Sequence, residues 1–517
     1  MACTTPRTDT GLTRRQTHLI FAGMLVSTFL AALDGTAVST ALPTIAGDLG
    51  GIDQLPWVLT AYLLGSVAAT PLYGKLSDLY GRRALTQAAL GIFVVTSVMA
   101  AAAQTMWQLI LSRGLQGVGG GGLMAMGFIV IGDIFSPRER GRYMAYYTMN
   151  FTLSAIVGPV IGGVFVDVSS WRWIFLVNVP LGVLAATVIQ RNLTFRLPVR
   201  EHRLDLIGAS ILVTSVTTLI MGLALAGETY AWTSWQVVIL LGYAAIGAVA
   251  FVRWEQRAEE PLLPMRLFGN PTFAILIAGN AIYGIAGMGV LAFFPLFFQV
   301  SLGESATRAG LIIGTMSIAV TVGSYAAGRI TTGTGRYRRL LLIAPSLSFV
   351  ALVAFTFLDR DSAAASAIPW LMLLGFSMGI AFPTMTTATQ NSLLLPDLGA
   401  GTAAINFFRT LGQTLGVGAF GALLTARITS ELAGLDANID AADLLSTPED
   451  IKALEPGLRS AVEDAVAVAS HAIFVAALPV MAVFVVAVWF LPELELRTTT
   501  ALSAQDDDPA DASTPPG

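Results

Sequence analysis

Residues 74–87 read GKLSDLYGRRALTQ and join two strongly apolar runs, residues 57–73 and 84–103. Asp78, Arg82 and Arg83 are thus concentrated between hydrophobic stretches. The whole chain has 517 residues, of which 55% are hydrophobic and only 12% are charged, and its mean hydropathy is +0.71. Soluble domains carry about 25% charged residues. A chain with half that share cannot cover a soluble surface of this size, so the composition predicts a membrane protein.

Apolar runs long enough to cross a bilayer recur along the chain. A spanning helix needs about 20 mostly apolar residues, and glycine and proline are tolerated inside it. The first run is too long for a signal-peptide core and many equivalents follow it, so we interpret it as a retained span. The sequence predicts an all-α membrane protein with fourteen transmembrane helices, near residues 18–40, 57–73, 84–103, 107–132, 146–166, 173–190, 205–225, 235–252, 272–299, 309–328, 340–358, 366–390, 402–425 and 470–491.

Lys and Arg are distributed unequally between the two sides of these spans. With the amino terminus inside, 21 of the 29 lie on inner segments and 6 on outer ones, and Arg113 and Arg409 fall within spans. Positive charge is enriched in cytoplasmic loops. The bias predicts a multi-pass protein of the cell membrane with both termini in the cytoplasm.

Two segments of the chain resemble each other. MNFTLSAIVGPVIG (149–162) and INFFRTLGQTLGVG (405–418) align without gaps. Parallel repeats of this kind occur in transporters built from two related halves. We therefore expect two six-helix bundles plus two extra central helices. The predicted division is a cytoplasmic tail (1–17), a bundle (18–190), two inserted helices (205–252), a second bundle (272–491) with an external loop (426–469) that contains a helical excursion, and a disordered acidic cytoplasmic tail (492–517).

Several functions have little support in the sequence. A net charge of −4 without a basic tract argues against nucleic-acid binding. The single cysteine, Cys3, and three scattered histidines provide no metal-ligand spacing. Lys75 is the only lysine after a glycine, and Leu76 follows it where an ATP-binding loop needs Ser or Thr. No nucleophile and base constellation indicates an enzyme, so we expect no catalytic activity, no metal and no cofactor.

The charged loop has two interpretations on its own. Gly74 and Gly81 permit tight turns and close helix approach. Asp78 precedes Arg82 by four residues, a favourable helical pairing, and its carboxylate could also lie at a neighbouring helix's amino end. Such a cluster could form and break as two bundles close and part. The alternative is an anchoring loop with an incidental acid.

Four stretches in order resemble one known family. The loop matches G-x-L-x-D-x-x-G-R-R and resembles the signature loop of the major facilitator superfamily. LDGTAVSTALPTI (33–45), LILSRGLQGVGGG (109–121) and SAIVGPVIGG (154–163) resemble motifs of its fourteen-span drug:proton antiporters, although Ser154 replaces the leading glycine of the last. The resemblance covers roughly residues 15–495 and implies the major facilitator fold.

The resemblance also implies roles for particular residues. Asp78 and Arg82 would form a latch between bundles at the cytoplasmic gate, with Asp133 as a partner. The second half's equivalent, GRITTGTGRYRRLL (328–341), keeps the basic residues but lacks the acid, so only one half carries a full latch. The implied gate residues are Gly74, Asp78, Gly81, Arg82, Arg83 and Asp133, and the antiporter-motif residues are Gly158, Pro159, Gly162 and Gly163.

Asp34 is the only acid well inside a predicted span. A charge there costs about 2.5–3.5 kcal/mol on insertion scales. Counted at 1.5 Å per residue, Asp34 lies roughly 6–9 Å and Arg113 roughly 9 Å from the outer ends of their spans. They could pair or share a water-filled cavity. A static ion pair is the simpler interpretation. A titrating pair would support antiport, because burial favours a neutral carboxyl group and arginine favours a charged one.

Further polar and aromatic residues could line a substrate cavity, although none is specific alone. Arg409 gives the spans two positive charges and one negative, which favours neutral or anionic cargo, unless it reaches backbone carbonyls or the interface instead. Asn178 either packs between helices or contacts substrate. The candidates are Trp57, Tyr62, Gln116, Asn178, Gln299, Gln390, Asn406 and Arg409. The run GVGGGG (117–122) is expected to permit close helix contact in lipid.

The leading functional hypothesis is a proton-coupled antiporter that exports hydrophobic small molecules such as drugs, antibiotics or toxic metabolites. A proton symporter for nutrient uptake shares the latch but does not need residues 154–163. A non-transporting membrane sensor would dispense with Asp34 and the latch. The expected partners are a small-molecule substrate, protons and the bilayer, with no nucleic acid, and we expect a monomer.

Overall fold

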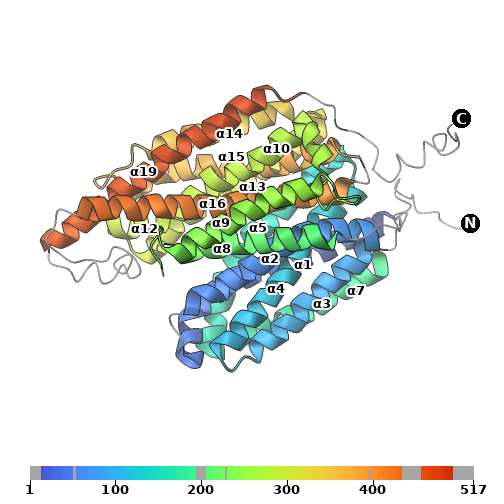
Figure 1. Cartoon of the computed structure of the whole chain (residues 1–517), viewed down its shortest axis with the longest axis horizontal. Coiled ribbons are helices and arrows are strands. Elements are labelled where there is room, and N and C mark those ends of the chain that lie inside the picture. The colour runs from blue at the N-terminus through green and yellow to red at the C-terminus, as the bar shows by residue number, and fades with distance from the viewer. Residues whose placement is uncertain are drawn as a thin grey trace, which may run out of the picture.

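The computed structural model describes residues 13–50, 54–193, 205–226, 230–394, 397–432, 456–492 and 496. Within these ranges the regular secondary structure is helical, and Ala226 and Tyr230 form an isolated β-bridge. Helices pack side by side along one long direction (Figure 1). We call the end where α1 begins and α19 finishes the termini end, and the other the far end. The tail residues 1–12 and 497–517 and loop residues 433–455 lie outside the described residues.

The first group of helices covers residues 14–192. A capping box at Thr13 starts α1, and Gly81, with φ of 86°, separates α2 from α3. Only a residue without a Cβ adopts that backbone conformation without strain. The helices of this group are α1 (Arg14–Leu49), α2 (Leu55–Tyr80), α3 (Arg82–Ala101), α4 (Met106–Ile134), α5 (Pro137–Val168), α6 (Arg172–Leu176) and α7 (Asn178–Asn192).

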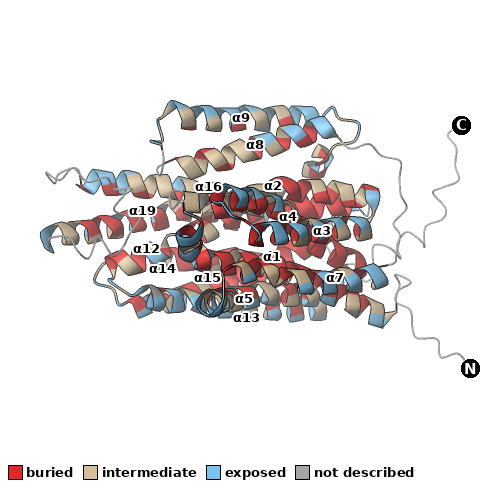
Figure 2. Ribbon diagram, turned by 90° about the horizontal axis from the view of Figure 1, so that it is seen from below, coloured by how far each residue is buried: buried red, intermediate tan, exposed pale blue. Residues whose placement is uncertain are grey.

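Two helices, α8 (Leu206–Leu225) and α9 (Trp235–Glu255), connect this group to the rest. They pack on each other, and α8 also contacts α2 and α16. Figure 2 shows them as a layer outside the other helices, with α5 and α13 on the opposite side. Beyond them lies a short 3₁₀ helix, η2 (Met265–Gly269).

The second group covers residues 271–489. Its first span, Pro271–Ser301, is broken into several pieces, two of them π-helical. The elements are α10 (Pro271–Ile282), η3 (Tyr283–Met288), α11 (Gly289–Leu291), α12 (Phe294–Leu296), η4 (Phe297–Ser301), α13 (Ala306–Thr334), α14 (Arg338–Phe355), η5 (Ala364–Ala367), α15 (Ile368–Asn391), α16 (Leu398–Leu432) and α19 (Pro456–Trp489).

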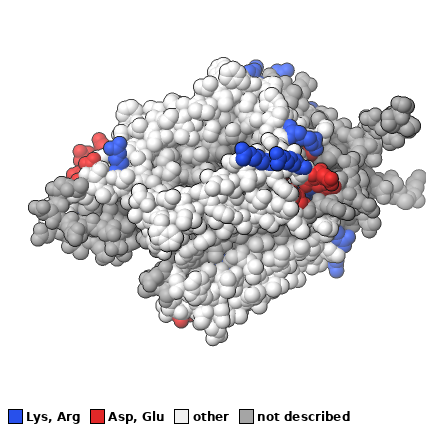
Figure 3. Space-filling model, in the orientation of Figure 1, with Lys and Arg blue, Asp and Glu red and all other residues white. Residues whose placement is uncertain are grey.

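Twelve helical segments in the described part of the chain are long and apolar enough to cross a membrane. These twelve do not include α2 or α16, so the count of fourteen spans stays a prediction. The helices around the expected loop 426–469 are longer than anticipated, since α16 continues to Leu432 and α19 begins at Pro456. On the face in Figure 3, charged side chains gather toward the two ends and leave an uncharged middle, as a bilayer requires.

The buried apolar residues form separate clusters. Two clusters lie wholly within residues 20–193, and another lies within residues 276–496. A fourth joins α2, α8, η2, α10 and α16. Within the first group, the glycine run on α4 lies against backbone atoms of α2, with Gly117 beside Tyr62 and Gly121 beside Ser66. The prediction that this run permits close helix contact is confirmed.

Candidate functional site

Asp34 of α1 and Arg113 of α4 form an ion pair at the centre of the first group. Arg113 Nη1 donates to Asp34 Oδ2, and neither side chain is exposed. A charge pair so buried is stable only with good geometry and further hydrogen bonds. The structure therefore brings together the two intramembrane charges that the sequence singled out in the first half.

Gln116 of α4 and residues of two more helices, α3 and α7, complete the hydrogen-bond network around this pair. Asp34 Oδ1 accepts from Gln116 Nε2 at 2.9 Å and from Asn178 Nδ2 at 3.0 Å. Ser97 Oγ of α3 accepts from the same two amides, at 2.8 and 3.3 Å. Gln116 Oε1 accepts from Arg113 Nη1 at 2.7 Å. The Asp34 carboxylate thus accepts hydrogen bonds from three donors, Arg113, Gln116 and Asn178.

A break in the sixth span places Asn178 in this network. The span is divided at Val177 into α6 and α7, and Pro180 lies in the first turn of α7. Proline removes a backbone donor and disrupts the helix that precedes it. Discontinuous helices of this kind lie at binding sites in many transporters. Asn178 thus reaches Asp34, whereas the sequence left its role open.

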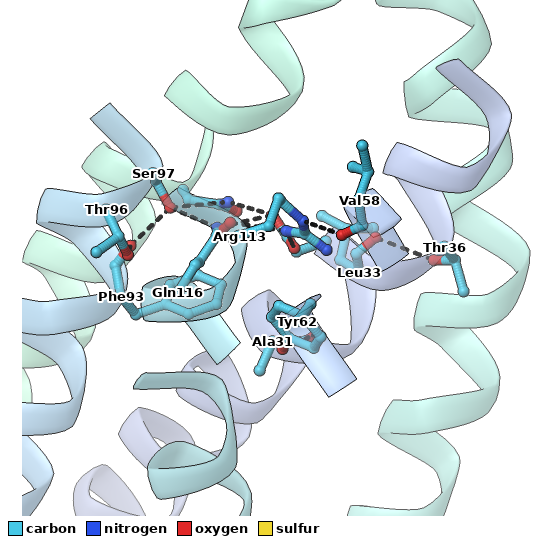
Figure 4. Close-up of polar contacts among 12 residues, drawn as sticks. Ala31, Leu33, Thr36, Val58, Tyr62, Phe93, Thr96, Ser97, Arg113 and Gln116 are labelled. Carbon is cyan, nitrogen blue, oxygen red and sulfur yellow. Dashed lines mark hydrogen bonds and ion pairs between the residues drawn. The ribbon is translucent and has the colours of Figure 1, made fainter. Parts of the chain in front are cut away.

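The aromatic ring of Tyr62 lies beneath Arg113, with the guanidinium 4.4 Å from the ring centroid (Figure 4). The Tyr62 hydroxyl donates to Ala31 O at 3.2 Å. Arg113 Nη2 and Asn178 Oδ1 are buried and have no hydrogen-bond partner in the described part of the chain. An unpaired donor and an unpaired acceptor beside a carboxylate can still form hydrogen bonds with water or with another group that carries a proton.

The first helix extends further beyond Asp34 than the sequence predicted. The candidate span runs from Arg14 to Leu42 and the helix itself continues to Leu49. At 1.5 Å per residue, Asp34 is about 12 Å from the Leu42 end of that span, where the sequence predicted roughly 6–9 Å. Arg113 lies seven residues from the start of α4, about 10 Å, which agrees with its predicted depth.

The second group has an uncharged cluster in the corresponding place. Ser377 Oγ of α15 lies 3.0 Å from the Tyr283 hydroxyl of η3 and 2.5 Å from Ser348 Oγ of α14. These elements are the first, third and fourth spans of their group, as α1, α3 and α4 are of theirs. The repeat therefore preserves the polar contact, and only the first group makes it with charges.

Arg82 organises the predicted gate at the termini end. Its Nε donates to Asp133 Oδ2 at 2.7 Å, and its Nη1 donates to Asp78 Oδ1 at 2.5 Å and to Ser77 Oγ at 2.6 Å. All four residues belong to the first group. Burial raises the pKa of the Asp78 carboxyl, against the opposing effect of Arg82. Arg83 is not in this cluster, because it points away and donates to Gln190 Oε1 at 3.1 Å.

The cluster touches the second group through Asp78. A Cβ built on Gly399, in the first turn of α16, would overlap the Asp78 carboxylate, and one built on Gly74 would overlap Ala403. The amino end of a helix favours a negative charge. The residues of the predicted gate therefore form ion pairs within the first group and a close glycine contact between the groups, a distinction that the sequence did not specify.

Other contacts between the groups lie near the same end. Arg138 of α5 donates to Thr332 O of α13 at 2.9 Å, and Gln390 of α15 donates to Phe128 O of α4 at 3.3 Å. Gly141 packs against Gly328. Nearer the middle, Thr321 donates to Thr152 at 3.1 Å. These contacts show the two groups closed against each other at the termini end.

The motif of the fifth span packs against α1, next to Asp34. Gly158 lies against Thr36 and Gly162 against Ala37, while a Cβ on Gly163 would meet no atom within 4 Å. Thr36 Oγ1 donates to Ser154 O at 3.1 Å, just before the turn that Pro159 disrupts. Two of the four motif residues, Gly158 and Gly162, are thus placed to fix α5 beside the helix that carries Asp34.

The remaining cavity candidates divide into two sets. Gln390, Asn406 and Arg409 lie at the interface between the groups, and Asn406 Oδ1 accepts from Arg409 at 2.8 Å. Trp57 packs in an apolar cluster of the first group, and half-buried Gln299 lies in η4 of the second group. Tyr62, Gln116 and Asn178 belong to the Asp34 network instead.

Sequence reasoning missed Ser97 and Arg140. Ser97 is one of many serines in predicted spans, and only the fold shows that its hydroxyl bridges two amides. Arg140 is buried and donates to Phe135 O at 2.9 Å and to Gly132 O, the carbonyls that end α4. Its position after a Pro-Arg-Glu turn gave no signal beyond a basic loop.

The sequence profile of the Major Facilitator Superfamily matches residues 24–417, so this chain belongs to that family. Multidrug transporter protein MdtP of Bacillus subtilis (strain 168) is 37% identical over 411 residues, which cover 79% of this chain and 75% of that protein. Multidrug resistance protein 3 of the same organism is 33% identical over 501 residues, covering 94% and 97%.

Solved structures agree on the fold at much lower identity. The proton:xylose symporter XylE has a TM-score of 0.61 and 13% identity, over 95% of this chain and 99% of that one. The human organic anion transporter MFSD10 has a TM-score of 0.58 and 13% identity, over 90% and 99%. The expected major facilitator fold is confirmed.

Proposed function

We propose that this protein is a secondary antiporter, which uses inward proton flow to export hydrophobic small molecules from the cytoplasm. The observation that carries the proposal is the fully buried Asp34–Arg113 pair with its ring of donors. An ionisable residue inside a membrane span is costly and is a functional candidate by default. The names of its relatives, which are multidrug transporters and efflux pumps, support the export of drug-like molecules.

The geometry favours ionised Asp34 in this conformation. Arg113, Gln116 and Asn178 all donate to its oxygens. The O–H of a protonated Asp34 carboxyl group would point at one of these donors, which cannot accept its hydrogen bond. Protonation therefore requires the network to rearrange. Protonation from outside would release Arg113 and let the empty carrier reset, and deprotonation inward would re-form the pair. The uncharged cluster at Tyr283 supports a proton site in one half only.

The two helix groups are proposed to be six-helix bundles that rock about the interface between them, with α8 and α9 as the inserted pair. The closed termini end, held by Arg82 and by Asp78 against Gly399, is the proposed cytoplasmic gate. We further propose fourteen spans, both termini in the cytoplasm, a monomeric carrier in the cell membrane and no cofactor. The excess of Lys and Arg on inner segments supports this orientation.

Purified protein in liposomes tests the proposal directly. A panel of hydrophobic dyes of different charge, ethidium among them, is loaded on the side that corresponds to the cytoplasm, with an acid gradient imposed from the other side. We expect uphill dye movement that requires the gradient and stops with a protonophore or with Asp34→Asn. Dye movement in the same direction as the protons would instead support a symporter. Uphill movement indifferent to the gradient would contradict proton coupling.

A further inference from the structure

Arg409 is a second intramembrane arginine, and the structure gives it no acidic partner. It lies on α16, half-buried, eleven residues from the helix start. Its guanidinium donates to Asn406 Oδ1, a neutral group on the same helix, at 2.8 Å. Among the described residues, no carboxylate lies within ion-pair distance of it. Arg113 differs from Arg409, because it is fully buried and paired with Asp34.

Aromatic rings from both helix groups surround this charge. The guanidinium carbon is 5.7 Å from the centroid of Phe128, on α4, and 5.3 Å from that of Phe382, on α15. Cation–π contacts of this length are worth about 0.5–2 kcal/mol, less than a full ion pair in a desolvated site. Arg409 thus faces the interface at which the groups meet and does not extend to the lipid headgroups.

The internal repeat argues against a purely structural role. In the alignment of 149–162 with 405–418, Leu153 of α5 stands opposite Arg409. Asn150 and Asn406 match, and both helices pack through glycines, Gly158 on α1 and Gly412 on the carbonyl of Ala281. The two glycines stand at different positions of the repeat, and the position of Arg409 itself is occupied by an apolar residue in the first half. The charge adds a cost in the second half without a packing benefit.

We propose that Arg409, with Phe128 and Phe382, forms a subsite for a hydrophobic aromatic acid. The Arg409 guanidinium would bind the carboxylate of the ligand, and the two phenylalanine rings would pack against its aromatic group. A bound carboxylate supplies the missing counter-charge by a charge-assisted, bidentate hydrogen bond. The two phenylalanine rings add apolar contact area that suits many different aromatic groups. A lipophilic cation would meet repulsion at the same point. As a statement about cargo, this inference rests on the proposed export function.

Equilibrium binding tests the subsite without any gradient. Purified protein in lipid nanodiscs is titrated by calorimetry with 2-naphthoate and with 2-naphthamide, which match in size and differ in charge, against empty nanodiscs. We expect the wild type to bind the acid more tightly than the amide. Arg409→Gln should weaken binding of the acid about tenfold, as expected for one lost charge-assisted hydrogen bond, and leave the amide within about twofold.

Controls separate the subsite from a general loss of structure. Arg427→Gln removes an exposed arginine from the same helix and should leave both affinities unchanged. Arg409→Lys should recover part of the preference for the acid, and Arg409→Leu, the residue of the first repeat, should recover none. Melting curves of all variants check folding. Equal affinity of the wild type for the two probes, or an Arg409→Gln variant that binds the acid normally, would overturn the subsite.

Transport separates this inference from the proposed function. If the wild type binds the acid with the predicted preference but dyes move without regard to the proton gradient, proton coupling fails and the subsite stands. If proton-coupled export of ethidium is intact and Arg409→Gln exports 2-naphthoate and ethidium in unchanged proportion, the export function stands and the subsite is wrong.

Discussion

Asp34 and Arg113 lie 79 positions apart in the chain and form an ion pair whose two side chains are both fully buried. A buried pair of this kind contributes little net stability, yet removal of one partner costs about 3–5 kcal/mol because the other charge remains uncompensated. Variants that lack one or both charges can therefore distinguish a static ion pair from a titrating one, when their stability and their transport are compared.

Neutralising both charges gives the sharpest comparison. Asp34→Asn and Arg113→Gln should each lower the melting temperature, by an amount that corresponds to about 3–5 kcal/mol, and the double variant should recover most of that loss. Proton-driven dye export should be lost in all three variants, because no group remains that can exchange a proton under the control of its partner. Thermal melting and liposome transport measure the two effects separately. A double variant that regains coupled export would show that the pair is structural.

Loss of Arg82 should open the termini end. Arg82→Gln leaves Asp133 buried and unpaired, with no exposure of its side chain. The closed arrangement then loses stability, and more molecules adopt a conformation in which the two helix groups are separated at the termini end. Spin labels at exposed Tyr80 and Leu394, one in each group, on a Cys3→Ser background report this as a longer distance distribution.

Arg83→Gln is the matched control for the gate, since Arg83 is half-buried and contacts Gln190 within its own group. It should leave the Tyr80–Leu394 distances unchanged. Identical distributions for Arg82→Gln and the wild type would mean that the cluster does not hold the gate.

The glycines of the fifth span should differ sharply in their tolerance of a methyl group. Alanine at Gly158 or Gly162 would push α5 away from Thr36 or Ala37, an overpacking that costs about 1–3 kcal/mol. Gly163→Ala meets open space and should melt like the wild type. We expect reduced export for the first two variants only. Equal behaviour of all three variants would argue that close α1–α5 packing has no part in transport.

Single cysteines on a Cys3→Ser background decide the topology. Gly47 and Tyr80 flank α2, and Leu394 and Glu431 flank α16, the two helices on which the count of fourteen depends. With an impermeant maleimide on intact cells, cysteines at Gly47 and Glu431 should react, and those at Tyr80 and Leu394 should react only in everted vesicles. If both cysteines of a pair reacted from the same side, the helix between them would not cross the membrane, and the number of spans would be lower than fourteen.

The sequence predicted the charged parts of the site better than their surroundings. Asp34, Arg113 and Arg82 stand out because a charge in or near lipid needs a partner, and few partners exist. Ser97 and Asn178 do not stand out, since their roles depend on a helix break and on side-chain directions. The length of α1 beyond Asp34 was underestimated, because the apolar span ends at Leu42 while the helix continues to Leu49. The π turns at Tyr283–Met288 had no recognisable signal among the glycines of that segment.

The inserted pair makes the two flanks of the protein unequal. Because α8 lies over both α2 and α16, one of the two lines along which the helix groups meet is shielded from the hydrocarbon, whereas the line between α5 and α13, on the opposite side, is uncovered (Figure 2). A compound dissolved in the membrane would therefore reach an uncovered line between the groups from the α5 and α13 side only.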